Sequence, residues 1–99
     1  MAVIEKTVKL IGSKTREKVV ALFDSGASYS CIQPQIAEKL GEIVPLGETL
    51  EVKTSEKGKI IKVTEVIELI FRFDGYRFFD EFMIIPDLSE TVIIGTKTM

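Results

Sequence analysis

Histidine is absent from the 99 residues of this chain, and its absence excludes several classes of catalytic chemistry. Serine and cysteine hydrolases that activate their nucleophile with an imidazole need this side chain, as do metal centres with histidine ligands. The single cysteine, Cys31, excludes an internal disulfide, and its apolar context indicates a small buried residue rather than a reactive thiol. The four aspartates are not spaced as a cation-binding loop. We therefore expect no cofactor and no metal.

An excess of one charge and a long apolar run are also lacking. Thirteen Lys and Arg stand against 15 Asp and Glu, mixed along the whole length, so no basic patch indicates nucleic acid. The first ten residues carry Glu5, Lys6 and Lys9, unlike a secretory leader or a membrane span. We expect a cytoplasmic protein that binds neither nucleic acid nor a membrane. The length and a hydrophobic content of 45% suit one domain over residues 1–99.

Short apolar segments separated by turn residues predict a mostly β structure. Val3–Ile11 alternates between apolar and polar residues, which is typical of a half-buried strand. The polar segment Gly12–Lys18 should return the chain into Val19–Phe23, whose five apolar residues predict a strand buried on both faces. Ser28–Ile32 is expected to form another short strand.

One helix is expected, over Pro34–Leu40, because proline is tolerated at the first helical position and Ile36, Ala37 and Leu40 share an apolar face. Gly41 should end this helix in a left-handed conformation, and Glu42–Gly47 should form a loop. Leu50–Thr54 and Lys59–Thr64 then bracket a polar segment and predict a projecting hairpin.

The last third of the chain predicts a second hairpin and a final strand. Val66–Phe73 and Tyr76–Ile85 flank Asp74-Gly75, the strongest short hairpin signal in the sequence. Thr91–Ile94 is the final strand, closed by Gly95. Together these elements predict a closed β structure with one helix.

Asp24 follows the apolar run directly and opens the triplet Asp24-Ser25-Gly26. Burial of a carboxylate costs free energy, which hydrogen bonds, a cation or a function that uses the acid must offset. Taken alone, the triplet also fits an ordinary Asx or Ser turn. Its context is more specific, because a second motif accompanies it far downstream, the apolar segment Val92-Ile93-Ile94 followed by Gly95.

With these motifs the sequence resembles the retropepsin-like aspartic proteases, the retroviral-type, single-domain relatives of the pepsins. The resemblance spans most of the chain and rests on Leu22–Ala27, the helix Pro34–Gly41, the hairpin around Ser55–Gly58, and Ile93–Gly95. It implies a closed β-barrel of the acid-protease type with one short helix and a flap hairpin. It also implies that the chain as given stops before the family's C-terminal helix and strand.

The resemblance assigns roles to individual residues. It implies that Asp24 is catalytic. The residues implied to support the catalytic turn are Ser25, Gly26, Ala27, Ile93, Ile94 and Gly95. The residues implied to bind substrate are Ser28 and, at the tip of the flap, Ser55, Glu56, Lys57 and Gly58.

Hydrolysis of an amide without a metal, histidine or cysteine needs one group that takes a proton from water and another that gives one to the carbonyl oxygen. Two adjacent carboxyls that share a proton can do both; aspartic proteases are the standard example of this arrangement. Asp74 and Asp87 do not lie in a comparable turn, so the second carboxyl should come from another copy. The sequence thus predicts a homodimeric aspartic endopeptidase that cleaves a peptide or protein substrate with water held between two Asp24 carboxyls.

Two other interpretations remain at this point. The chain could be a catalytically inactive retropepsin-like module for dimerisation or peptide binding, because fold alone does not secure activity. It could also be a small β-barrel in which Asp24 is only a turn residue. Either the sequence as given is a trimmed form of the family's domain, or its protomers associate in another way, for which the N-terminal strand is the candidate.

Overall fold

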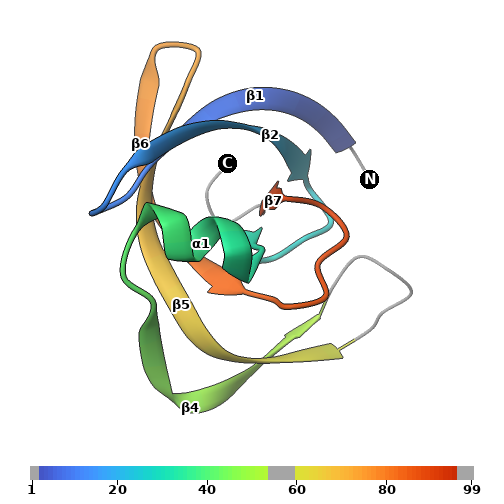
Figure 1. Cartoon of the computed structure of the whole chain (residues 1–99). Helices are drawn as coiled ribbons and strands as arrows, with labels where there is room; N and C mark the ends of the chain where they lie inside the picture. Colours follow the sequence, from blue (N-terminus) through green and yellow to red (C-terminus); the bar gives the residue numbers. More distant parts are fainter. Residues whose placement is uncertain (1–2, 54–59, 96–99) are drawn as a thin grey trace.

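A computed structural model describes residues 3–53 and 60–95 of the chain (Figure 1). Strands dominate these residues, with one helix between the third and fourth strands. The elements are β1 (Val3–Ile11), β2 (Arg16–Asp24), β3 (Cys31–Ile32), α1 (Pro34–Leu40), β4 (Val44–Lys53), β5 (Ile60–Phe73), β6 (Tyr76–Ile84) and β7 (Val92–Ile94).

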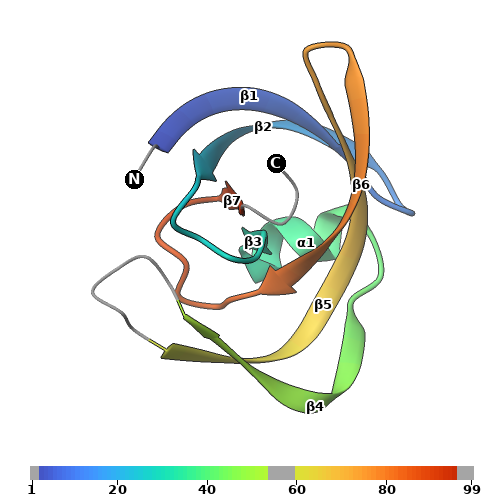
Figure 2. The ribbon, with the colours of Figure 1, turned by 180° about the vertical axis from the view of Figure 1, so that it is seen from behind.

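The strands close into a barrel. They follow the order β1-β2-β7-β3-β6-β5-β4, and an additional pairing of β1 with β5 closes the first six of these strands into a ring. β4 pairs with β5 alone and lies outside the ring, as Figures 1 and 2 show from opposite sides. The predicted closed β-barrel with one short helix is confirmed for the described residues.

β1 and β2 form the expected antiparallel hairpin, in register from Val3 opposite Asp24 to Ile11 opposite Arg16. The prediction that the apolar part of β2 is buried on both faces is wrong. Val20 is 55% exposed, whereas its neighbour Ala21 is fully buried. A barrel wall has one face toward the core, and no element of the described residues covers the outer face at Val20.

α1 has the predicted bounds and carries proline in its first turn. Ala37 and Leu40 are fully buried in the core of the barrel, so the predicted apolar face is confirmed. Gly41 is not left-handed as expected, because its φ of −174° is ordinary extended backbone. Glycine is favoured here because there is little room for a side chain: a Cβ at residue 41 would lie 3.0 Å from Oγ of Ser13.

The projecting hairpin exists but is longer than predicted. β4 begins at Val44 rather than Leu50, with a register shift between Pro45 and Leu50 where the sequence predicted a loop. Proline is tolerated there because β4 is an edge strand. β5 continues through Thr64 to Phe73 as one strand of 14 residues instead of two. The flap tip predicted at Ser55–Gly58 lies outside the described residues.

The hairpin of β5 and β6 turns at the predicted residues. Asp74 and Gly75 have φ values of 51° and 79°, the conformation that a two-residue hairpin loop requires. Phe71 is buried and stacks on Phe78 with ring centroids 4.9 Å apart.

No helix among the described residues is long and apolar enough to span a bilayer.

Candidate active site

β2 carries Asp24 to the point where the chain turns out of the barrel wall. Asp24 is only 3% exposed. The backbone N–H of Gly26 donates to its Oδ1 at 2.8 Å, and the N–H of Ala27 donates to its carbonyl oxygen at 3.1 Å. The bond from Gly26 offsets part of the cost of burying the carboxyl and fixes its direction, and the bond from Ala27 closes the backbone turn.

β7 holds the turn from behind. It pairs in parallel with β2, which sets Ile93 opposite Leu22, and antiparallel with β3, which sets Ile93 opposite Cys31. Since β2 enters the turn and β3 leaves it, one strand braces both of its ends. Ile94 points into the core and is fully buried, whereas the half-buried Ile93 lines a cavity. The structure thus brings the two predicted motifs together.

Gly95 completes this brace. Its N–H donates to Oγ of Ser30, which is 2% exposed, at 3.2 Å. A Cβ at residue 95 would lie 2.6 Å from the carbonyl carbon of Tyr29, closer than atoms can approach. Ser30 was missed in the sequence because nothing in its own neighbourhood links it to a residue 65 positions away.

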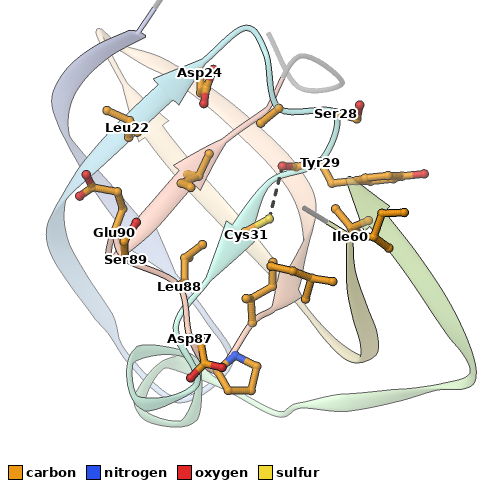
Figure 3. Close-up of a pocket in the computed structure, with 16 residues that line it drawn as sticks. Leu22, Asp24, Ser28, Tyr29, Cys31, Ile60, Asp87, Leu88, Ser89 and Glu90 are labelled. Atoms are coloured by element: carbon orange, nitrogen blue, oxygen red, sulfur yellow. Dashed lines mark hydrogen bonds between the residues drawn. The ribbon is translucent and has the colours of Figure 1, made fainter. Parts of the chain in front are cut away.

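A cavity of about 360 Å³ opens beside Asp24 (Figure 3). Its walls come from the turn after β2, from the hairpin of β4 and β5, and from the loop before β7. Ser28, predicted to bind substrate, lies in the wall, whereas Ser25 and Gly26 do not. The predicted tip residues Ser55, Glu56, Lys57 and Gly58 lie outside the described residues. The apolar lining residues are Leu22, Ala27, Tyr29, Val52, Ile60, Ile61, Ile85, Leu88 and Ile93.

The wall formed by residues 86–90 was not predicted from the sequence. It contributes Asp87 and Glu90 to the cavity. Gln33, which precedes α1, holds this loop: its Nε2 donates to the carbonyl oxygen of Leu88 at 3.0 Å, and its backbone N–H donates to that of Thr91 at 3.2 Å. Only the paired β3, β6 and β7 bring these segments together, so no local pattern could reveal the contact.

Cys31 also lines the cavity but is 4% exposed. Burial raises the pKa of its thiol to about 12, and its Sγ lies 3.5 Å from the carbonyl oxygen of Tyr29, to which it donates. The thiol is therefore protonated near neutral pH and is a poor nucleophile. The predicted buried cysteine is confirmed. Within residues 3–53 and 60–95, no group of three or more potential ligands could hold a metal.

These features define a class of protein, a small β-barrel that presents the buried aspartate of an Asp-Ser-Gly turn beside a largely apolar cavity. The family model described as aspartyl protease matches residues 7–98, so the chain belongs to the aspartyl protease family. The fold and the predicted resemblance to retropepsins agree with this assignment.

Two solved structures from foamy viruses have a similar fold. The solution structure of the simian foamy virus (mac) protease is 22% identical with a TM-score of 0.57, over 94% of this chain and 90% of that one. The foamy viral protease-reverse transcriptase, solved in complex with an RNA/DNA hybrid, is 20% identical with a TM-score of 0.60. That match covers 95% of this chain but only 11% of the viral one. No curated protein sequence matches this chain significantly.

Proposed function

We propose that this chain is an aspartic endopeptidase whose working form is a homodimer. One observation carries the proposal: Asp24 is buried and oriented by a backbone N–H, yet it forms part of a cavity wall. An acid with only a structural role in a turn would not need a position beside an apolar cavity. Membership of the aspartyl protease family supports the same function.

The chemistry needs two Asp24 carboxyls that share one proton. The ionised carboxyl takes a proton from water, the water oxygen bonds to the peptide carbonyl carbon, and the protonated carboxyl gives its proton to the carbonyl oxygen. In the second half, a proton moves from the resulting diol through the carboxyls to the amide nitrogen. The C–N bond then breaks, which releases an acid and an amine.

The second carboxyl is proposed to come from a partner copy, because neither Asp74 nor Asp87 is placed to pair with Asp24. Asp74 occupies the turn of the β5–β6 hairpin. Asp87 lines the same cavity as Asp24, but Figure 3 places the two labelled side chains at opposite ends of it. A two-fold axis beside the turn would instead bring two identical carboxyls together.

The start of β1 offers an interface for such a dimer. Val3 and Ile4 are 49% and 54% exposed, and they pair with Asp24 and Phe23 at the catalytic end of β2. On the other edge of β1, only Lys9–Ile11 pair with β5 among the described residues. The start of the strand can therefore pair with a second copy and bury apolar surface beside the turn.

The remaining site residues are assigned within this proposal. Ser25, Gly26 and Ala27 shape the turn, and Ile93, Ile94 and Gly95 brace it. Ser28 contacts substrate from the cavity wall, and the β4–β5 hairpin acts as the flap with its tip at residues 55–58.

Peptide cleavage by the purified chain tests this function. We expect cleavage at acidic to mildly acidic pH that pepstatin-like transition-state mimics suppress. Asp24→Asn should abolish cleavage and keep the fold, because the amide oxygen can still accept from Gly26. Asp74→Asn is the matched control and should keep full activity, since asparagine tolerates a positive φ. Cleavage that survives Asp24→Asn would refute the proposal, whereas peptide binding without cleavage by the wild type would favour an inactive binding module.

A further inference from the structure

The charged side chains that line the cavity beside Asp24 are all acidic among the described residues. Three lining residues, Asp24, Asp87 and Glu90, carry carboxyls, and none of the described lining residues is Lys or Arg. We propose that this cavity selects substrates with a long basic side chain, Lys or Arg, whose cation is bound by Asp87 or Glu90. This inference rests on the proposed peptidase function and names its substrate class.

The shape of the cavity fits a side chain with an apolar stem and a charged end. Leu22, Leu88 and Ile93 supply apolar wall to the same cavity. In Figure 3, Glu90 lies next to Leu22, and Asp87 lies at the end of the cavity away from Asp24. The methylene stem of Lys or Arg can cover such a wall while its cation reaches a carboxylate at the margin.

Asp87 and Glu90 are available for a cation from the substrate. Neither forms an ion pair with another residue in the described part of the chain. Asp87 is exposed and Glu90 is half-buried, so both are hydrated before substrate binds. A bound peptide would cover the cavity and lower the local dielectric, which strengthens attraction to a cation. Because Glu90 is less exposed, we expect it to contribute more than Asp87.

The acidic wall is also held in place before substrate arrives. Gln33 fixes the loop at Leu88 and Thr91, on either side of Glu90. The N–H of Leu88 also donates to the carbonyl oxygen of Ile85 at 3.3 Å. A carboxylate on a fixed loop loses less conformational entropy when it binds a cation than one on a free loop.

Matched peptides test the inference. A peptide that the wild type cleaves is remade with Lys, norleucine or Glu at each position near the scissile bond; norleucine keeps the stem of Lys without its charge. We expect one position at which Lys exceeds norleucine by roughly tenfold in kcat/KM and Glu is the poorest. This preference should shrink as salt rises.

Variants assign the preference to the acidic wall. Glu90→Gln and Asp87→Asn together should bring the ratio of Lys to norleucine cleavage from roughly tenfold to about one. Glu68→Gln, on the exposed outer face of β5, is the matched control and should keep the preference. Equal cleavage of Lys and norleucine peptides at every position would overturn the inference, as would a preference that survives the double variant.

Binding to Asp24→Asn separates this inference from the peptidase proposal. Fluorescence anisotropy should show tighter binding of the Lys peptide than of the norleucine peptide, lost in the Asp87→Asn, Glu90→Gln background. Charge-dependent binding without any cleavage by the wild type would refute the peptidase proposal and retain the acidic cavity as a ligand site. Cleavage by the wild type without a charge preference would refute the acidic cavity as a specificity site and retain the peptidase proposal.

Discussion

Gly95 lies against the backbone of Tyr29 so closely that a Cβ at residue 95 would be 2.6 Å from the Tyr29 carbonyl carbon and 2.7 Å from its oxygen. The contact joins the end of β7 to the segment that leaves the Asp24 turn. The glycine is required here by the closeness of another backbone.

Gly95→Ala should therefore destabilise the protein. Overpacking against backbone, which has little room to shift, costs about 1–3 kcal/mol. Urea unfolding followed by circular dichroism would measure the loss. Gly75→Asn is a useful contrast, because that turn has open space and a positive φ that asparagine tolerates. A loss at Gly95 no larger than that at Gly75 would contradict the steric explanation.

Ser30→Ala should leave the N–H of Gly95 without its present acceptor. Ser30 is 2% exposed, so the expected cost is about 1–3 kcal/mol in the free energy of unfolding. Ser28→Ala, two residues earlier and exposed, serves as the control for stability. Equal unfolding midpoints for the two variants would show that the hydroxyl does not brace the turn.

Cys31 should make stability fall at alkaline pH. Burial raises the pKa of its thiol from 9.0 to about 12, so above pH 9 the unfolded chain releases a proton that the folded chain keeps. Ionisation then favours the unfolded state, and the free energy of unfolding decreases from pH 9 to 12, with the full contribution present below pH 9. The free energy of unfolding, measured by urea titration at each pH, should fall more steeply with pH for the wild type than for Cys31→Ala over this range. Parallel pH profiles would contradict the buried thiol.

Gln33→Glu should loosen the wall formed by residues 86–90, because it replaces the Nε2 donor to Leu88 with a carboxylate oxygen. We expect faster hydrogen exchange at the Leu88 amide and a lower kcat/KM, with the fold retained. Gln35→Glu makes the same chemical change on the exposed face of α1 and should alter neither. Unchanged exchange in Gln33→Glu would show that this hydrogen bond does not position the loop.

Local patterns in the sequence account for the parts that were predicted well. The helix was recognisable from Pro34 and the spacing of Ala37 and Leu40, and the β5–β6 turn from Asp74-Gly75. The hydrogen bond that the buried Asp24 accepts was foreseeable from the cost of burying a carboxylate after an apolar run.

The failures lie where tertiary contacts decide. The residues around Val20 do not show that its side chain faces outward. Those around Gly41 do not show that residue 41 packs closely against Ser13. The extension of β4 to Val44 depends on its partner β5, which a loop-like sequence around Pro45 conceals. The acidic wall was missed because Gln33 meets Leu88 across 55 residues.

Mixing active and inactive chains tests the central claim most directly. If each site needs an Asp24 from two chains, equal amounts of wild type and Asp24→Asn, allowed to exchange subunits, should show about a quarter of the activity of wild type at the same total chain concentration. If each chain works alone, the mixture should keep about half, in proportion to the wild-type chains present. The account predicts the quadratic dependence on wild-type fraction, and a linear dependence would contradict it.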